Sequence, residues 1–585
     1  MTQQEGLSWP GGRIVVLDGV TGAVEYELDE NPAEGTYGAH GRSTPGVTDV
    51  NGDGLPDIIY AGRTAGGSPI VAVDGATGTL LWIAQDAGGA TARFSVENGA
   101  PSFANFDADP EAEIVFGAAM IDNDGLVVWD QGGNGAAVGT NAGYTGGISA
   151  LADLTGDGYP EVISGAQAWS VTWSDVGGMP EVSVALLWDA GGDDGYPAIA
   201  DVDLDGNPEV VLVANGFVRV LERDSGLAWC GVDPTQAMCN ADPTLRTAAV
   251  ALPGGGRGGP PTVADFDGDG RPEIAAAGGS SYTVYDLYRE GEAIAGPSNP
   301  ALGDVYERWS RETQDQSSNA TGSSVFDFQG DGAAEVIYAD ECFMCVYDGS
   351  TGTVLVEEPS SSATIHEYPL VVDVDDDGNS EVLVVSNDSH GACDAIEGYE
   401  EKRGVFVYGD VFDRWVGTRR VWTSHAYHVT NVTSAGNAPS MELDNWTQSG
   451  LNNYRQNVQG AGTFNAPDLE VELQALLSEC ANSALVVVAT VRNAGALGVP
   501  AGVEVTLFEG EDAMGTEIGT QPTSVPLLPG QTTQLSWDVP IEALGVEKDF
   551  FVQVDGAEAA AGVVDECDEG NNDAVSLDAE CPVAG

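Results

Sequence analysis

The chain is poor in basic residues. It has 20 lysine and arginine residues against 92 aspartate and glutamate residues, which gives a formal net charge of -72 at pH 7. Lysine occurs twice, as Lys402 and Lys548. A surface of this charge repels phosphate backbones and anionic lipids, so nucleic acids and anionic membranes are poor partners, and we expect no nucleic acid partner.

Long apolar runs and the common enzyme signatures are absent as well. No apolar run reaches the roughly 18 residues that span a bilayer. Residues 1–12 lack the basic and apolar parts of an export signal, so if the protein is exported, its signal has been removed or replaced by Met1. No GxSxG, HExxH or P-loop pattern occurs, which leaves serine-hydrolase, zinc-protease and nucleotide chemistry without a motif.

Cysteine is sparse, with eight residues in a chain of 585, but the count is even. An even count is typical of disulfides formed in an oxidising compartment. Cys230 and Cys239 would close a short loop, whereas Cys480 has two candidate partners, Cys567 and Cys581. The chain's single CxxC motif lacks the second copy that a zinc site needs.

Acidic loops repeat along the chain. Seven segments share the pattern of VADFDGDGRPEIAAAG, which starts at Val263, and their first loop positions follow one another at intervals of 46 to 64 residues. These first positions are Asp49, Asn105, Asp153, Asp201, Asp265, Asp327 and Asp373. Apolar runs rich in β-branched residues follow the loops, and Asp-Gly and Thr-Gly turns lie between them. This spacing predicts about four short strands per repeat.

The loop pattern D-x-D-x-D-G-x-x-[DE], followed by an apolar strand, resembles the FG-GAP or VCBS repeats of the integrin α-subunit β-propeller and its bacterial relatives. The resemblance covers residues 11–460 and implies a seven-bladed propeller. Eight blades are the alternative, because an extra hairpin over residues 14–28 precedes the first loop and the segment after Trp422 would have to supply the missing strands.

The same resemblance implies structural calcium, up to seven ions, held by the side chains at loop positions 1, 3, 5 and 9 and by a backbone carbonyl at position 7. The implied ligand side chains are Asp49, Asn51, Asp53 and Asp57; Asn105, Asp107, Asp109 and Glu113; Asp153, Thr155, Asp157 and Glu161; Asp201, Asp203, Asp205 and Glu209; Asp265, Asp267, Asp269 and Glu273; Asp327, Gln329, Asp331 and Glu335; Asp373, Asp375, Asp377 and Glu381.

The loops differ in their acidic content. The sets that begin at 201, 265 and 373 are the fullest, and the first loop is also a good set. Asn105, Thr155 and Gln329 each replace a carboxylate, so those three loops are predicted to bind calcium more weakly. Position 9 is glutamate in six loops, where the integrin pattern has aspartate. The alternative interpretation is that all seven are ordinary Asx-Gly turns with solvated carboxylates.

Residues 421–460 break the repeat. His425, Tyr427 and His428 lie close in sequence, and with Arg455 they are weak candidates for a ligand-binding or catalytic site. The alternative is that this stretch is a structural segment that closes the repeat domain. Two histidines at this spacing, without a nearby acidic ligand, are little evidence for zinc.

The composition changes again after Ala466. The stretches VRNAG, LLPGQ, SWDV and ECDEGNN over residues 491–572 resemble the CARDB domain, an immunoglobulin-like β-sandwich of bacterial surface proteins. The resemblance implies a second domain over residues 466–582 and a secreted or envelope-exposed protein.

The sequence therefore predicts an all-β, secreted or cell-surface calcium-binding protein that acts in adhesion by binding an extracellular protein or glycan. The long stretches 169–188, 229–257 and 288–319 are candidates for specificity, and their aromatic residues either stack on a ligand or cover the sheets. The alternative function is a polysaccharide lyase acting on an acidic glycan, but the shortage of basic residues favours binding over catalysis.

Overall fold

The computed structural model describes most of the chain. The described residues are 11–28, 38–63, 67–107, 109–143, 146–175, 180–289, 294–296, 298–387, 389, 391, 393–411, 414–448, 450–459, 467–477, 480, 484–495, 498–527, 531–541, 543–555 and 571–581. Cys567 and most of the ECDEGNN stretch lie outside them.

The repeats fold into antiparallel sheets in which consecutive strands pair. The strands are short and rich in β-branched and aromatic residues, which favour extended backbone. Six of these sheets have four strands. The first three contain β5 (Gly46–Thr48), β6 (Asp57–Ala61), β7 (Ile70–Val73) and β8 (Leu80–Ile83); β9 (Ser102–Ala104), β10 (Glu113–Phe116), β11 (Ala119–Ile121) and β12 (Val127–Asp130); and β13 (Ser149–Ala152), β14 (Glu161–Ser164), β15 (Gln167–Asp175) and β16 (Pro180–Asp189). The next three contain β17 (Tyr196–Ala200), β18 (Glu209–Ala214), β19 (Phe217–Glu222) and β20 (Val250–Ala251); β21 (Thr262–Ala264), β22 (Glu273–Ala277), β23 (Ser281–Leu287) and β24 (Val305–Glu312); and β25 (Ser323–Phe326), β26 (Glu335–Ala339), β27 (Phe343–Tyr347) and β28 (Val354–Pro359).

Smaller elements complete this part of the chain. A three-stranded sheet contains β29 (Leu370–Val372), β30 (Glu381–Ser386) and β31 (Gly404–Tyr408). β2 (Ile14–Leu17) pairs with β3 (Val24–Leu28), and β1 (Gly11–Gly12) pairs with β4 (Ala39–His40). The described helical turns are α1 (Ala237–Ala241), η1 (Gln131–Gly133), η2 (Gly135–Ala137), η3 (Pro243–Leu245), η4 (Val429–Asn431) and η5 (Asn445–Thr447).

The sheets are separate from one another. No described strand of one sheet pairs with a strand of another sheet, and none of the sheets is closed or curled into a propeller. The predicted seven-bladed propeller and its eight-bladed alternative are therefore wrong. The predicted all-β class is supported, but the structure does not support the finer prediction of a propeller followed by a sandwich. The repeat pattern predicts local strand pairing but carries no information on how sheets join, and the seventh repeat contributes three strands rather than four.

Neighbouring sheets meet at their first strands. β9 contacts β13, β13 contacts β17, and the same holds for β17 with β21, β21 with β25, and β25 with β29. Residues of successive sheets also share core clusters, as Phe326 of β25 and Val371 of β29 do. Contact between sheets is thus made by side chains and by single backbone hydrogen bonds, such as that from Val127 N to Gln85 O.

The segment over residues 414–459, here called the crossing segment, runs across these first strands. Thr423 accepts a backbone hydrogen bond from Val47, while Tyr454 forms a bridge with Val263. The Asn452 side chain bonds both the N–H and the C=O of Asp201, 251 residues earlier in the chain. The crossing segment therefore ties early and middle sheets together.

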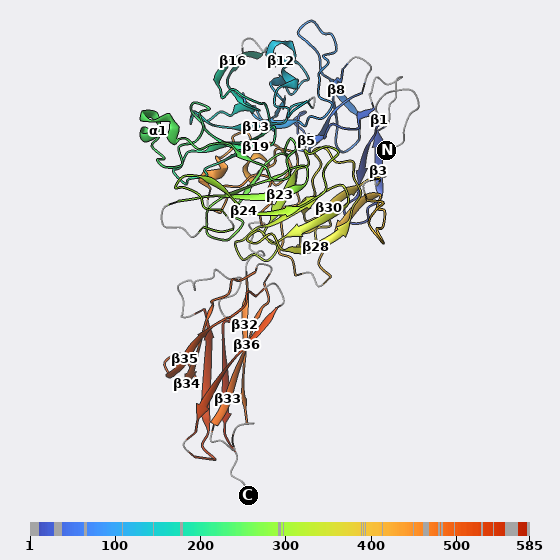
Figure 1. Ribbon diagram of the computed structural model, residues 1–585. Helices are drawn as coiled ribbons and strands as arrows, with labels where there is room; N and C mark the ends of the chain where they lie inside the picture. The colour runs from blue at the N-terminus through green and yellow to red at the C-terminus, as the bar shows by residue number, and fades with distance from the viewer. Residues whose placement is uncertain are drawn as a thin grey trace.

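Two further sheets lie after residue 467. One contains β32 (Leu469–Leu476), β33 (Ala484–Asn493) and β36 (Thr532–Pro540); the other contains β35 (Thr516–Pro522), β34 (Glu504–Glu509), β37 (Lys548–Val554) and β38 (Asp573–Ala579). Alternate residues of β33, such as Leu485 and Val487, share a core with Leu507 and Val552 of the other sheet. In Figure 1 these strands, coloured orange to red, form an elongated body beside the rest of the chain.

Candidate metal loops

All seven acidic loops connect the first strand of a sheet to the second strand. In each loop, position 9 is the first residue of that second strand, and it pairs across the ladder with the residue before position 1. Glu273, for example, lies opposite Ala264. The short first strand and the tight loop therefore gather each predicted ligand set at one end of its own sheet.

Positions 1 and 5 shape the loop through backbone hydrogen bonds. In the fifth loop, Asp265 accepts the N–H groups of Gly268 and Gly270, each at 2.7 Å, and Asp269 accepts that of Arg271 at 2.9 Å. The bond from the N–H of position 7 to the carboxylate of position 5 recurs in all seven loops, at 2.8 to 3.1 Å. Turn formation therefore uses the same side chains that are proposed to hold a metal.

The carboxylate at position 9 is fixed in the same way in every loop. One of its oxygens accepts the backbone N–H of position 2, at 2.7 to 3.1 Å. The long arm of glutamate allows the side chain to reach back over the loop while its own backbone starts the strand. Asp57 makes the same bond with its shorter side chain, so the bond does not require glutamate.

Burial raises the pKa of these position 9 carboxyl groups, and the neighbouring aspartates raise it further. The pKa is raised to about 6 for Asp57, to about 7 for Glu161 and Glu381, to about 9 for Glu113, Glu273 and Glu335, and well above the ordinary value for Glu209. A carboxylate that is buried among other carboxylates keeps its charge when a cation lies close to it. The loops thus have the electrostatics of cation sites.

Four of the seven loops bring three carboxylates close together. The groups are Asp107, Asp109 and Glu113; Asp201, Asp203 and Glu209; Asp265, Asp267 and Asp269; and Asp373, Asp375 and Glu381, with one oxygen of each residue within 4.8 Å of the others. The last three are the sets that the sequence ranks as fullest. The first belongs to a loop that the sequence ranks as weaker.

In the other three loops an uncharged side chain at position 3 donates to position 9. Asn51 Nδ2 donates to Asp57 at 3.1 Å, and Thr155 Oγ1 donates to Glu161 at 3.4 Å. The Gln329 amide, in the orientation that satisfies it, donates to Glu335. In these three loops the buried carboxylate thus has a hydrogen-bond donor that belongs to the loop itself. The first loop, which we predicted from the sequence to be a good metal set, is one of the three.

A protein cation lies beside the fifth loop. The guanidinium of Arg308, on β24, lies 2.7 Å from Asp267 and 3.2 Å from Asp286, and its side chain is 11% exposed. Its positive charge offsets part of the charge of the loop. Sequence reasoning missed Arg308, because no local pattern relates a residue of the fourth strand to the loop between the first two.

The second loop contains a buried oxygen without a partner. Glu113 is fully buried, its Oε2 accepts the N–H of Phe106 at 2.7 Å, and its Oε1 has no hydrogen-bond partner. A buried, unsatisfied carboxylate oxygen is costly. Asp107 and Asp109 offer further oxygens close by. An all-oxygen donor set of this kind suits Ca²⁺ or Mg²⁺ better than zinc, so the residues present fit the predicted ion.

Three of the loops open into one cleft of about 1050 Å³. Its lining includes the position 1 residues Asp265, Asp327 and Asp373, together with Arg419 and Arg420 of the crossing segment. Arg271 also lines the cleft, so three arginines lie next to the three acidic loops and the cleft is a site of mixed charge. Such a site has partners for both anionic and hydroxyl groups of a ligand.

The four weak catalytic candidates lie inside the protein. His425, Tyr427, His428 and Arg455 are between 0 and 5% exposed. Arg455 Nε donates to the carbonyl oxygen of His425 at 3.1 Å, and His428 Nε2 contacts a carboxylate oxygen of Glu442. The structure buries these side chains with separate polar partners, and we assign them no catalytic role.

The aromatic residues of the long inter-strand stretches are mostly covered. Trp169 and Trp309 are buried, whereas Trp173 and Tyr288 are half-buried. Trp169 packs in a core cluster with residues of β10 and β11. The sequence left open whether these aromatic residues stack on a ligand or cover the sheets. Trp169 and Trp309 cover the sheets.

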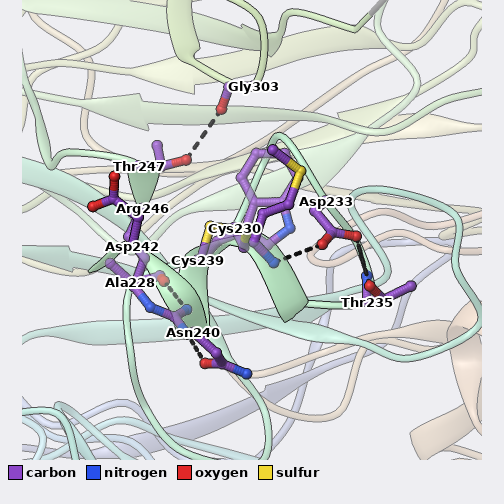
Figure 2. Close-up of a disulfide and its surroundings, with 12 residues drawn as sticks. Ala228, Cys230, Asp233, Thr235, Cys239, Asn240, Asp242, Arg246, Thr247 and Gly303 are labelled. Atoms are coloured by element: carbon purple, nitrogen blue, oxygen red, sulfur yellow. Dashed lines mark hydrogen bonds between the residues drawn. A yellow bond between two sulfur atoms is a disulfide. The ribbon is translucent and has the colours of Figure 1, made fainter. Parts of the chain in front are cut away.

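Three disulfides join described cysteines: Cys230–Cys239, Cys342–Cys393 and Cys480–Cys581. The first confirms the predicted short loop, and the third selects one of the two predicted partners of Cys480. Figure 2 shows the first bond beside α1, where Arg246 donates to the carbonyl oxygen of Ala228 at 2.6 Å and to Asn240 at 2.9 Å. Disulfides are typical of proteins in oxidising compartments.

Neither a protein-family model nor a curated protein matches the chain, so the FG-GAP or VCBS resemblance is not confirmed. The crystal structure of the V. cholerae biofilm matrix protein Bap1 is similar, with a TM-score of 0.55 and 18% identity over 77% of this chain and 90% of that chain. At this identity the likeness shows the fold alone.

Two other solved structures match with low TM-scores. The CARDB domain of the PF1109 protein from Pyrococcus furiosus, solved in complex with di-metal ions, is 25% identical over 21% of this chain and 93% of that chain, with a TM-score of 0.16. The Photorhabdus luminescens Tc holotoxin pore is 10% identical over 85% of this chain and 23% of that chain, with a TM-score of 0.20. We draw no argument from either match. No helix of the described residues is long and apolar enough to cross a membrane.

Proposed function

We propose that the chain is an extracellular adhesion protein whose acidic loops are stabilised by calcium. The observation that carries the proposal is the position 9 carboxylate, which recurs in seven loops and is buried in all of them except that of Glu381, where it is partly buried. It lies among other carboxylates in the loops at 105, 201 and 373. The unpartnered Oε1 of Glu113 supports an ion in the first of these three.

The proposed location rests on the disulfides and on the structural neighbour. Three disulfides support folding in an oxidising compartment. The Bap1 neighbour is a biofilm matrix protein, and the extreme acidity of the present chain fits a role among extracellular cations rather than nucleic acids. We take residues 11–460 as the ligand-binding unit and residues 466–582 as a second, separate unit.

The proposed ligand is an extracellular protein or glycan that binds in the mixed-charge cleft. Arg420 is 60% exposed on its side chain and pairs with Asp376 at 2.6 Å, so a ligand carboxylate or sulfate group would compete for a guanidinium that is already at the surface. The buried cluster around His425 and Arg455 lies apart from solvent, and we do not pursue the lyase alternative.

The test is a calcium count combined with thermal unfolding. Elemental analysis of the dialysed protein should find at least three bound ions, and EGTA should lower the unfolding temperature, because an ion present at 100 times its Kd stabilises the folded state by about 2.7 kcal/mol. Asp203→Asn should remove one ion, whereas Asp74→Asn, which changes a hairpin turn outside the loops, should remove none. A protein without bound calcium, whose unfolding is unchanged by EGTA, would contradict the proposal.

A further inference from the structure

Five hairpin turns in the repeat region share two features. In each, the N–H of a glycine bonds the carbonyl of the acidic residue that opens the turn, and the glycine has a positive φ. The glycines are Gly22 between β2 and β3, Gly78 between β7 and β8, Gly125 between β11 and β12, Gly226 after β19 and Gly352 between β27 and β28. The turns belong to the β2–β3 hairpin and to the sheets that begin with β5, β9, β17 and β25.

Four of the five turns are held by an aromatic side chain from another strand pair. Tyr26 Oη donates to Gly75 O at 2.5 Å, Trp82 Nε1 to Asn123 O at 2.7 Å, Trp188 Nε1 to Arg223 O at 2.6 Å and Trp309 Nε1 to Gly349 O at 2.6 Å. The ring also packs on the turn glycine: a Cβ added at Gly352 would lie 2.5 Å from Trp309 Cε3. We call this combination of hydrogen bond and ring contact the aromatic latch.

The latch residue always lies on the last strand of the sheet before the turn. Trp82, Trp188 and Trp309 are on the fourth strands β8, β16 and β24, and Tyr26 is on the second strand of the β2–β3 hairpin. The last strand of one sheet therefore contributes the aromatic residue that packs on the turn of the next sheet and donates a hydrogen bond to it. The pattern predicts what should hold the fifth turn.

The fifth turn, at Gly22, has no latch among the described residues. A Cβ added at Gly22 would meet no atom within 4 Å, in contrast to the other four glycines. Gly19 in the same turn lies against the carbonyl of Val374, in the loop between β29 and β30. The sheet before this turn is thus β29–β30–β31, and no described strand occupies the position of its fourth strand.

Among the described residues, part of that sheet is also less covered than the other sheets. Every residue of β6, β10, β14, β18, β22 and β26 is buried, but the equivalent strand β30 alternates between buried and partly exposed residues. Val385 pairs with Val405 across the ladder, and both are about half exposed, as is Val407. On the hairpin, Val15, Leu17 and Val24 are between 40 and 53% exposed. We call the space between the β29–β30–β31 sheet and the β2–β3 hairpin the open seam.

We propose that the open seam binds an extended segment of another polypeptide as a fourth strand beside β31, with a tryptophan or tyrosine of that segment latched on Gly22. An edge strand with free hydrogen-bonding groups accepts such a strand, and alternate apolar side chains of the segment would cover the exposed valines. The charge at the end of the segment can also be inferred. In the β25–β28 sheet, the fourth strand places Glu357 and Glu358 opposite the start of the third strand, β27. The third strand of the β29–β30–β31 sheet is β31, and two basic residues, Lys402 and Arg403, come directly before it. An acidic end therefore suits the segment.

The probe for the test is a fluorescent peptide of residues 78–87 of this chain, which contains the fourth strand β8 and the latch residue Trp82. Fluorescence anisotropy with the full chain in calcium buffer should show saturable binding. A peptide with Trp82→Ala should bind at least 10-fold more weakly. In the protein, Val407→Glu places a charge in the open seam, and Gly22→Asn keeps the positive φ while it fills the ring position; each should weaken binding at least 10-fold.

Val354→Glu is the matched control, because Val354 is similarly exposed but lies on β28, outside the open seam. It should leave binding unchanged, and all variants should keep the wild-type unfolding temperature. Absence of binding by the wild-type chain, or equal binding by Val407→Glu and Val354→Glu, would overturn the proposal. A dimer that Val407→Glu dissociates would assign the open seam to a second copy and overturn it too. None of these outcomes depends on calcium in the loops.

Discussion

The aromatic latch can be tested inside the folded chain with two glycines of almost equal backbone conformation. Gly352 has φ +67° and Gly22 has φ +64°, so alanine at either position costs the same backbone strain, about 1–2 kcal/mol. At Gly352 the new methyl group would also lie 2.5 Å from Trp309 Cε3 and 2.6 Å from Cδ2, whereas at Gly22 it would meet nothing within 4 Å.

The difference between the two variants therefore isolates the ring contact. Overpacking costs about 1–3 kcal/mol, and a displaced ring weakens the 2.6 Å bond from Trp309 Nε1 to Gly349 O, which contributes about 1 kcal/mol. We expect Gly352→Ala to lower the free energy of unfolding by about 3–6 kcal/mol and Gly22→Ala by about 1–2 kcal/mol.

The assay is urea-induced unfolding with saturating calcium, followed both by circular dichroism and by tryptophan fluorescence, so that coincident transitions justify a two-state treatment. Gly132→Ala serves as a strain control, because Gly132 has φ +62° and open space around it. If Gly352→Ala and Gly22→Ala lose the same free energy, the rings do not hold the turns, and the reasoning behind the open seam fails with them.

Three further predictions follow from the loops, a buried histidine and a disulfide. Asn51→Asp removes the internal donor to Asp57 and adds a carboxylate, so calorimetric titration should count one calcium site more than in wild type, at the cost of lower stability in EGTA. Burial lowers the pKa of His366 to about 4, whereas in the unfolded chain the pKa is near the ordinary value of about 6.5. Between these pH values the folded state binds fewer protons than the unfolded state. The free energy of unfolding should therefore fall by up to about 3 kcal/mol as the pH is lowered from 6.5 to 4. His366→Gln should lack this part of the pH dependence in urea unfolding, and equal slopes would contradict the assignment. Replacing Cys480 and Cys581 by serine opens a loop with a separation of 101 residues and should cost about 5 kcal/mol, against about 3 kcal/mol for Cys230 and Cys239 with a separation of 9. Calorimetry should place the larger loss in the transition of the C-terminal sheets, and a reversed order would refute the loop-length argument.

The sequence predicted local features well. Position 9 falls on the first residue of a strand in all seven loops, because acidic turn residues and the apolar run after them determine the boundary between turn and strand. The short disulfide loop at Cys230 was predictable for the same reason, since its two cysteines are close in sequence.

One prediction was wrong, that of the propeller, and two contacts of the acidic loops could not be predicted from the sequence. The first loop was ranked as a good metal set, but only the structure shows that Asn51 donates to Asp57. The fifth loop was ranked among the fullest, but Arg308 comes from a strand that local patterns do not relate to it. The propeller was inferred from repeat spacing, which constrains pairing within a repeat and not the relation between sheets.

The crossing segment has a consequence for the order of folding during synthesis. Each sheet of the seven repeats pairs consecutive strands and can form as soon as it leaves the ribosome, but Ala438 N bonds Thr48 Oγ1 across 390 residues and Asn452 bonds Asp201 across 251. Contacts of such separation form after local ones. A growing chain is therefore a row of sheets in contact with their neighbours, and the ties that the crossing segment makes to Thr48 and Asp201 form only after residues 438 and 452 have been made.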